Sequence, residues 1–338
     1  MRKILNGLIY FLNWIAALLM VVSFSLPYLP PKKFPAVSVL SLGVPVVIVI
    51  NLVFLFFWLI QLNRRLFLSL AVLVFSYFYF NVFYEFSSEG NPADYQNTLS
   101  IVSYNVRLFN AYERENHGDV PEMMKELLET EDPDVICIQE YYKPNKVDLT
   151  HYPHRFIHFK RKNTKLGHAI FSKYPLTNKK AFDFKNTGNN VIYADMVKGQ
   201  DTIRIYNMHL QSMGIEAEIQ YLQQEDTEEL ARKISHRFRL QEDQIQKVLS
   251  HKSKSKHPVV FCGDMNNTPF SYVYRKINAG MQDSFREKGS GLGTTFSFDG
   301  FPMRIDYIFA SPEFDVISFK TFKETFSDHR AIRSVIGW

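Results

Sequence analysis

The chain has 338 residues, enough for two domains or one large one, and its two cysteines are too few for a disulfide framework. The net charge of +5 comes from residues 1–85, which carry six basic residues and one acidic residue, whereas residues 86–338 carry 33 of each sign. This composition excludes collagenous, disordered and small disulfide-rich proteins. The neutral second part also argues against nonspecific polyphosphate binding.

Three charge-free runs, over residues 4–31, 34–63 and 66–84, occupy the start of the chain. Each is long enough for a helix that crosses the hydrocarbon core of a bilayer, which takes about 20 residues. We therefore expect residues 1–85 to form a membrane anchor of three transmembrane helices, at about 4–29, 36–62 and 66–84, the second kinked near Gly43 and Pro45. A cleaved signal peptide over residues 1–30 is the alternative, but no small-residue cleavage site stands out and two further runs follow.

Basic pairs flank these runs and predict the orientation of the anchor. The pairs are Arg2 with Lys3, Lys32 with Lys33, and Arg64 with Arg65. The first and third pairs share one side of the membrane and give that side four basic residues, against two on the other side. This difference places the N-terminus in the cytoplasm. An odd number of spans then places residues 86–338 outside the cytoplasm. The runs contain no acidic, basic or histidine residue of the kind that marks a transport pathway, so an integral membrane anchor is expected.

After a polar linker over residues 86–97, short apolar runs alternate with helical patterns. The expected strands are Leu99–Tyr104, Val135–Ile138, His168–Phe171, Val191–Val197, Thr202–Met208, Val259–Cys262, Ile305–Phe309 and Ala331–Ile336. Helices are expected from the N-cap Asp119 to about Glu129, from Thr227 to about Ser250, and after Asn267. This mixture predicts an α/β sandwich in which one sheet packs on another.

Polar side chains recur where these strands end. They are Asn105, Glu140, His209, Asp264, Asn266, Asp306, Asp328 and His329. Each one alone is more often a turn or packing residue. Strand termini at one edge of a fold converge, however, so together they predict one pocket.

The chemistry of this set favours hydrolysis of a phosphate ester. Carboxylate and amide oxygens are hard ligands that suit Mg²⁺ or Mn²⁺, and a histidine held by an aspartate is an acid or base near neutral pH. Nucleophilic catalysis is less favoured, because the sequence has no Gly-x-Ser-x-Gly motif and because Cys137 and Cys262 lie inside apolar runs, where thiols are inert.

These residues lie in motifs that resemble the endonuclease/exonuclease/phosphatase superfamily, which has the deoxyribonuclease-I-like fold. Seven motifs follow the family order, at residues 103–107, 138–140, 167–175, 207–209, 263–269, 304–306 and 327–329. The resemblance covers residues 98–338 and implies a four-layered α/β sandwich with Mg²⁺-dependent phosphoester hydrolase activity. Bacterial membrane-anchored members look similar, which implies the bacterial inner membrane.

The resemblance also implies a metal site and a water-activating group. Glu140 would bind Mg²⁺ or Mn²⁺, with Asn105 and Asp328 close to it. Asp264 would orient or deprotonate the attacking water, and Asn266 would hold a phosphate oxygen.

Histidines complete the implied site. His329 would contact the phosphate, oriented by Asp306, and His209 would protonate or stabilise the leaving oxygen. His168 and Asn207 are further candidates for substrate binding. Whether Asp264 or a histidine acts as the base stays open.

Three functions stay open as well. A phosphodiesterase or phosphatase acting on a lipid headgroup or another small phosphoester is favoured by the helices and by the neutral second part. An extracytoplasmic endo- or exonuclease acting on DNA or RNA is favoured by nine basic residues between Arg155 and Lys185. The complete motif set argues against a non-catalytic binding domain. No obligate protein partner is evident.

Overall fold

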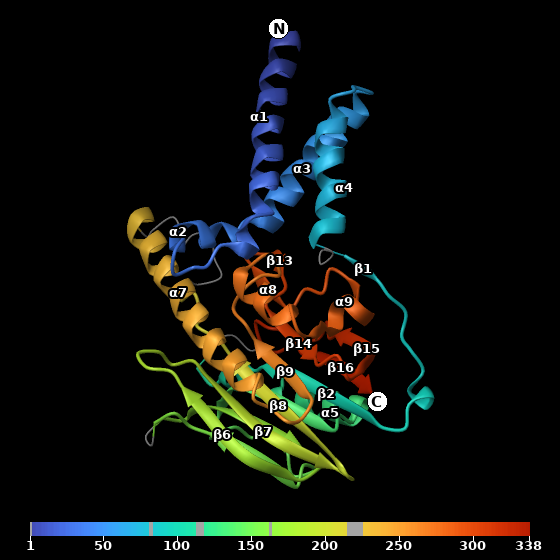
Figure 1. Cartoon of the computed structure of the whole chain (residues 1–338), viewed down its shortest axis with the longest axis vertical. Coiled ribbons are helices and arrows are strands. Elements are labelled where there is room, and N and C mark those ends of the chain that lie inside the picture. The colour runs from blue at the N-terminus through green and yellow to red at the C-terminus, as the bar shows by residue number, and fades with distance from the viewer. Residues whose placement is uncertain (1, 81–83, 113–117, 162–163, 215–225) are drawn as a thin grey trace.

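A computed structural model describes residues 2–80, 84–112, 118–161, 164–214 and 226–338. Figure 1 shows three long N-terminal helices standing on one end of an α/β domain, with the N-terminus at their far tip. The helices are α1 Arg2–Ser23, α2 Pro35–Ser38, α3 Val44–Ile60, α4 Leu66–Phe80, α5 Val120–Glu131, α7 Thr227–Lys252, α8 Tyr272–Asn278 and α9 Ser284–Lys288. The strands are β1 Glu85–Phe86, β2 Thr98–Asn105, β3 Val135–Tyr142, β4 His154–His158, β5 Leu166–Ser172, β6 Leu176–Asp183, β7 Asn190–Lys198, β8 Asp201–His209, β9 Val259–Asp264, β10 Gln282–Asp283, β11 Ser290–Gly291, β12 Phe296–Phe298, β13 Phe301–Met303, β14 Asp306–Ala310, β15 Asp315–Thr321 and β16 Ile332–Gly337.

Buried polar side chains hold the three long helices together. Asn13 of α1 donates a hydrogen bond to Ser69 Oγ of α4 at 2.6 Å and accepts one from the Trp58 indole of α3 at 3.0 Å. Asn51 of α3 donates to the carbonyl oxygen of Ala16 at 3.1 Å. Because a polar group in apolar surroundings costs free energy unless it is paired, these bonds fix how the helices pack.

The expectation of three complete transmembrane helices is not supported. Among the described residues, one helix is long and apolar enough to cross a membrane, and the pair Pro35–Leu42 and Val44–Ile60 is a second candidate only if its two parts, bent by 53°, count as one span. The bend falls at Gly43, beside Pro45, where a kink was expected. The 15 residues of α4 rise about 23 Å, less than a hydrocarbon core of about 30 Å. Residues 81–83 of the expected third span lie outside the described residues.

Two six-stranded sheets form the α/β domain. Their strand orders are β15-β16-β2-β3-β5-β4 and β10-β14-β9-β8-β7-β6. Each sheet contains one parallel pair, β2 with β3 and β8 with β9, among antiparallel pairs. Parallel neighbours end at the same edge of a sheet, so both pairs bring the residues after them to one place.

The sheets pack face to face, and helices cover their outer faces, which confirms the α/β class. Ile101 and Cys137 of one sheet meet Ile205 and Val260 of the other in the central core. Met124 of α5 packs on the outer face of the first sheet, and α7 and α8 pack on the outer face of the second. Helix, sheet, sheet and helix are the four layers that the family resemblance implied.

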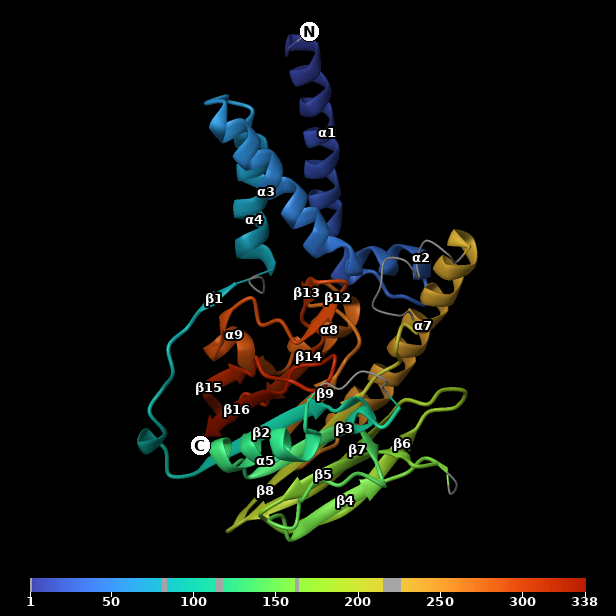
Figure 2. The same cartoon turned by 180° about the vertical axis from the view of Figure 1, so that it is seen from behind.

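Residues 86–97, the predicted linker, connect the N-terminal helices to the α/β domain and contact that domain. Gly90 donates its backbone N–H to the carbonyl oxygen of Ile317 at 2.7 Å, and Asn97 exchanges two backbone hydrogen bonds with Trp338. Figure 2 shows the segment running along the side of the domain. The connection is therefore packed against the domain that it joins.

The segment between α1 and α3 is docked on the α/β domain. The backbone N–H of Lys32 donates to Glu242 at 2.7 Å, and its ammonium group lies 2.6 Å from Asp243. The Thr268 hydroxyl donates to the carbonyl oxygen of Ser41 at 2.9 Å. Figure 2 shows α2 beside α7. The N-terminal helices thus contact the loop that follows β9.

A buried ion pair predicts how stability depends on pH. The Arg204 guanidinium donates two hydrogen bonds to the Asp195 carboxylate, at 2.7 and 2.9 Å. Burial alone would raise the pKa of Asp195, but the bonds from Arg204 and Asn178 outweigh it and hold the pKa below its ordinary value of 3.8. The stabilisation is therefore present above that value and is lost as the pH falls through the lower folded-state pKa.

We expect Asp195→Asn to lower the free energy of unfolding by about 1.5–3 kcal/mol at neutral pH, the range for a hydrogen bond to a charged group. The difference from the wild type should narrow as the pH falls below 3.8 and the wild type becomes protonated at Asp195. Denaturant unfolding over a series of pH values, from neutral into this acidic range, measures the difference. A difference that stays constant would contradict the role of this pair.

Candidate active site

The residues predicted to share a pocket meet at one edge of the two sheets. Backbone pairing sets His209 of β8 beside Asp264 of β9, and Asp264 beside Asp306 of β14. Asn105 ends β2 in the other sheet, and its amide donates to Asp264 at 3.1 Å. The site therefore spans both sheets, with Asp264 at its centre.

Asp264 is a buried carboxylate in a dense hydrogen-bond network. It accepts from the backbone N–H of Asn266 at 2.7 Å and from the side-chain amide of the same residue at 3.1 Å. The Nε2 atoms of His209 and His329 lie 3.6 and 3.8 Å from one of its oxygens. Burial raises the pKa of Asp264 to about 6. The group is thus ionised at neutral pH but basic enough to accept a proton from water.

His329 is held by Asp306 through a hydrogen bond of 2.9 Å at Nδ1. Burial alone would lower the pKa of His329, but the carboxylates of Asp306 and Asp264 outweigh it and raise the pKa to about 10. The ring is therefore an imidazolium at neutral pH, suited to a negatively charged phosphate oxygen. A charged ring cannot accept a proton, which narrows the choice of base to Asp264 and His209.

Two neutral histidines lie next to this charged group. Burial lowers the pKa of His209 and holds that of His168 well below its ordinary value. Their ring centroids are 5.5 Å apart. Nδ1 of His168 is buried without a hydrogen-bond partner in the part of the chain that is described. His168, a candidate for substrate binding, therefore lies against His209.

Glu140 lies inside β3 and not at its end, where the sequence placed it. The register of β3 on β5 shifts between Ile138 and Tyr141, and Glu140 itself has a φ of 53°. Such a bulge redirects a side chain at the cost of backbone strain. The Glu140 side chain is 28% exposed and lies 3.9 Å from Nε2 of His209. Burial raises the pKa of its carboxyl group, and the nearby negative charge of Asp328 adds to the shift.

The oxygen atoms around Glu140 fit a hard divalent cation. The Glu140 and Asp328 carboxylates repel each other, and the Arg107 guanidinium lies 3.4 Å from Asp328. The Asn105 side-chain oxygen accepts one hydrogen bond, from the backbone N–H of Arg107 at 3.2 Å, which leaves one lone pair. Two carboxylates and an amide oxygen are the donors that Mg²⁺ and Mn²⁺ prefer.

A second group of possible ligands consists of Asp264, Asp306 and His329, whose ligand atoms lie within 4.8 Å of one another. Asp306 and His329 are hydrogen-bonded to each other, so each has already used one ligand atom. A protonated histidine does not bind a metal. By donor chemistry, the oxygen atoms around Glu140 therefore suit a hard divalent cation better than this group does.

Asn207, a candidate for substrate binding, lies inside the protein and pairs with other residues of the chain. It is fully buried and donates to the carbonyl oxygens of Ile138 and Ala169, both at 2.9 Å. Its own side-chain oxygen accepts from Gln139 at 2.7 Å. A polar side chain at this place must pair within the protein, so Asn207 ties β8 to β3 and β5 of the other sheet.

Asn266 stands at the turn after β9, with a φ of 50°. Its amide nitrogen donates to the carbonyl oxygen of Leu210 and to Asp264, both at 3.1 Å. Both amide hydrogens are thus used within the protein. The expected hydrogen bond from Asn266 to a phosphate oxygen would have to replace one of these two hydrogen bonds. The observed contacts of Asn266 hold the Asp264 carboxylate in position.

Gly263 precedes Asp264 and cannot be replaced without strain. Its φ is 133°, and a Cβ atom would lie 2.0 Å from the carbonyl oxygen of Met208. We expect Gly263→Ala to lose at least about 1–3 kcal/mol of stability and to lose activity, because Asp264 moves. Gly199→Ala is the matched control, since that residue has a φ of 61° and nothing within 4 Å. Thermal unfolding and hydrolysis rates test this, and equal effects of the two substitutions would contradict it.

Two contributors to the site were not predicted. The Thr295 hydroxyl accepts the backbone N–H groups of Ile305 and Asp306, both at 3.1 Å. The Phe296 ring packs on His329 with centroids 5.0 Å apart. Both residues lie at or beside β12, a strand of three residues that is too short for its pattern to be read from the sequence.

Comparisons with known proteins agree with this geometry. The Endonuclease/Exonuclease/phosphatase family matches residues 102–329, and a domain of unknown function (DUF8431) matches residues 4–83. A search of curated proteins gave no match.

Solved structures resemble the α/β domain. An endonuclease/exonuclease/phosphatase from Beutenbergia cavernae DSM 12333 has a TM-score of 0.52 and 18% identity, covering 72% of each chain. A family protein from Leptotrichia buccalis C-1013-b has a TM-score of 0.52 and 18% identity, covering 71% of this chain and 100% of that one. D. rerio TDP2 complexed with single strand DNA product has a TM-score of 0.54 and 16% identity, covering 72% and 100%. At such identities the likeness shows the fold alone.

Proposed function

The chain belongs to the Endonuclease/Exonuclease/phosphatase family, whose members are metal-dependent hydrolases of phosphate esters. We propose that it is a membrane-anchored enzyme that uses Mg²⁺ to cleave a lipid headgroup or another small phosphoester. The observation that carries the proposal is the His329 ring, hydrogen-bonded to Asp306, beside the Asp264 carboxylate and the oxygen atoms around Glu140.

Glu140, Asp328 and the side-chain oxygen of Asn105 would hold the cation. Bound there, a divalent ion neutralises phosphate oxygens and stabilises the leaving oxygen. The raised pKa of Glu140 supports this assignment, since a buried carboxylate beside a second one gains from a positive charge.

Asp264 is the base in this proposal. Its carboxylate takes a proton from water, and the water oxygen forms a bond to phosphorus while the bond from phosphorus to the leaving oxygen breaks. His329 stabilises the negative charge on the phosphate oxygens during this step. Neutral His209 donates a hydrogen bond to the leaving oxygen, which takes a proton from solvent water as the alcohol departs. Asp264 then returns to solvent the proton that it took from the attacking water.

The arrangement of the N-terminal helices supports an anchor with the site outside the cytoplasm. The pair Arg2 and Lys3 lies at the far end of α1, away from the α/β domain (Figure 1). The chain then returns to that far end through α3 and comes back through α4. The α/β domain therefore lies on the side of the membrane opposite the N-terminus. This holds whether α3 and α4 cross the bilayer fully or form a re-entrant hairpin.

A nuclease is the second candidate, favoured by the basic residues between Arg155 and Lys185. Several of these charges are used within the protein. The Lys160 ammonium donates to the carbonyl oxygen of Thr187 at 2.5 Å, and Lys173 lies 2.5 Å from Asp132. Lys162 lies outside the described residues. Fewer free charges are then left for a nucleic-acid backbone, and the neutral domain favours a small or lipid phosphoester.

A substrate screen of the full-length protein tests the proposal. It covers phosphoinositide and sphingomyelin vesicles, sugar phosphates, and single- and double-stranded DNA and RNA at low salt. We expect Mg²⁺-dependent hydrolysis of a lipid or small phosphoester that EDTA abolishes. Cleavage confined to nucleic acid would favour the nuclease, and no hydrolysis of any substrate would favour a binding domain.

A further inference from the structure

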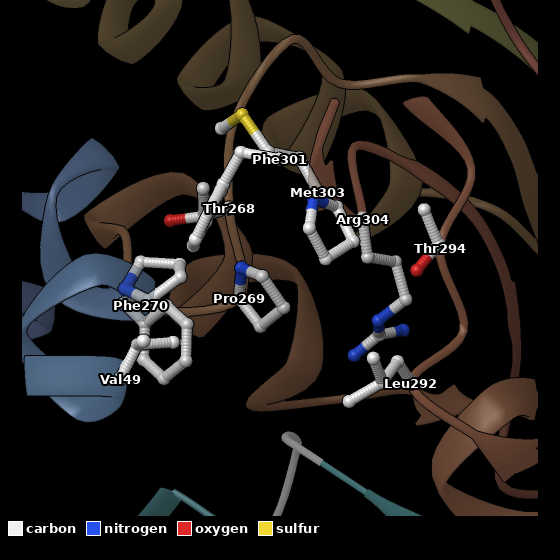
Figure 3. Close-up of a pocket in the computed structure, with 11 residues that line it drawn as sticks. Val49, Thr268, Pro269, Phe270, Leu292, Thr294, Phe301, Met303 and Arg304 are labelled. Carbon is white, nitrogen blue, oxygen red and sulfur yellow. The ribbon is translucent and has the colours of Figure 1, made fainter. Parts of the chain in front are cut away.

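An apolar cavity lies between α3 and the domain that carries the site. Its volume is about 160 Å³, and its lining is Pro45, Val49, Thr268, Pro269, Phe270, Leu292, Thr294, Phe301, Pro302, Met303 and Arg304. Figure 3 shows Val49 and Phe270 on one side of it and Leu292 on the other. Most of these side chains are hydrocarbon, so the cavity suits an apolar ligand. The polar members of the lining are Thr268, Thr294 and Arg304, and the Arg304 guanidinium is paired with Asp283 at 2.7 Å through Nη1.

One wall of the cavity is shared with the active site. Thr294 lines the cavity. The hydroxyl of the next residue, Thr295, accepts the backbone N–H of Asp306, and the ring of Phe296 packs on His329. Thr268, which also lines the cavity, stands two residues after Asn266. The cavity and the phosphoester site therefore lie on the two sides of the segments around β12 and the turn after β9.

The opposite wall belongs to the N-terminal helices. Val49 lines the cavity, and Val53, one turn further along α3, is 62% exposed. Phe80, at the last described position of α4, packs edge-on against Phe270 with centroids 4.7 Å apart. In an anchored protein these ends of α3 and α4 lie at the membrane surface, so the cavity adjoins the surface of the helices that faces lipid.

We infer that this cavity holds part of a hydrocarbon chain of a membrane lipid while the phosphoester of the same lipid lies at His329. A dry apolar cavity of about 150 Å³ in another protein holds benzene, so this one has room for a chain segment but not for a whole lipid. The lipid-facing surface of α3 leads into the cavity, and the hairpin of β12 and β13 lines it on the side of the domain. This inference deepens the proposed function and rests on its membrane anchoring.

Photo-crosslinking tests chain binding without requiring catalysis. The full-length protein is placed in vesicles of phosphatidylethanolamine and phosphatidylglycerol in which a fraction of the acyl chains carries a diazirine. After irradiation, we expect crosslinks on residues 45–49 and on 301–303, in the wild type and equally in Glu140→Ala. Crosslinks confined to exposed positions of the helices, such as Val53, would overturn the inference.

Substitutions that fill the cavity provide the matched comparison. Val49→Trp and Leu292→Trp fill it from opposite walls, and each should reduce crosslinking at 301–303 at least fivefold. Val53→Trp, on the lipid-facing surface, should leave it unchanged. Thermal unfolding shows whether each variant folds. If one of the two cavity-filling variants does not fold, crosslinking of the variant on the opposite wall provides the test. Undiminished crosslinking in a folded cavity-filling variant would overturn the inference.

Hydrolysis of bis(p-nitrophenyl) phosphate separates this test from the proposed function. If the wild type hydrolyses that soluble ester with Mg²⁺ but the crosslinks miss the cavity, the chain-binding inference fails and the hydrolase stands. If the crosslinks form in the cavity but no phosphoester is cleaved, the lipid site stands and the proposed function fails.

Discussion

Glu140→Ala is expected to lower the rate of phosphoester hydrolysis by at least about 10²–10³-fold, the usual loss when one electrostatic contact to the transition state is removed. The carboxylate is one of three oxygen donors that would hold the cation, and no other described acidic group takes its place at the bulge of β3. The fold should survive, because the side chain is partly exposed and alanine meets the same positive φ.

Hydrolysis of a soluble phosphodiester over a range of Mg²⁺ concentrations measures this effect. The variant should also need more Mg²⁺ for half-maximal activity, a shift that a purely structural role would not produce. Glu122→Ala, at an exposed residue of α5 paired with Lys125, is the control and should behave like the wild type. Wild-type activity of Glu140→Ala at the same Mg²⁺ concentration would exclude Glu140 from the metal site.

His329→Ala should cost about 10²–10³-fold in turnover, because the imidazolium that stabilises the phosphate charge is lost. The variant also leaves Asp306 without its partner and Phe296 without a ring to pack on. Asp306→Asn should act through His329, by lowering its charge and loosening its orientation. We expect a smaller loss from that substitution than from His329→Ala.

Steady-state kinetics of both variants test these roles, with circular dichroism to verify folding. His151→Ala, at a histidine whose side chain is 70% exposed, is the control. A loss below tenfold for His329→Ala in a folded protein would contradict a direct role of this residue with the phosphate. A larger loss for Asp306→Asn than for His329→Ala would assign the main role to Asp306.

The central strands of the fold were predictable from the sequence, and the edge strands were not. Six of the eight expected strands fall within strands of the two sheets, and the other two, which start at Ile305 and Ala331, begin one residue before β14 and β16. Most of their residues are apolar, because both faces of these strands are covered. The edge strands β4, β6, β10 and β15 were missed. The residues of β6 are mostly exposed and polar, because one side of an edge strand faces solvent, so the apolar signal is absent.

Helix starts were predictable because a single side chain determines them. Asp119 accepts the backbone N–H of Glu122 at 3.3 Å and begins α5 where it was expected, and Ser271 caps α8 in the same way. The break of the second apolar run at Gly43 was expected as a kink, but its extent was not. A run of apolar residues reports an apolar environment and carries no information about where one helix stops and the next begins.

The site was predictable where its residues close a strand, because parallel strand ends converge by geometry. Asp264, His209 and Asn105 follow that rule. Glu140 departs from it, since a bulge in mid-strand leaves no mark in the sequence. The buried position of Asn207 was not predictable for a similar reason. Strand residues alternate between two faces, and which face carries the site depends on the packing of the two sheets.

A crystal structure of the full-length protein grown with Mn²⁺, with anomalous data collected at the manganese edge, tests the proposed site most directly. We predict one anomalous peak bonded to the Glu140 carboxylate, with Asp264 and His329 free of metal and still hydrogen-bonded to their protein partners. A peak within the Asp264, Asp306 and His329 group, or no peak at either position, would contradict the assignment of the metal and of the charged histidine.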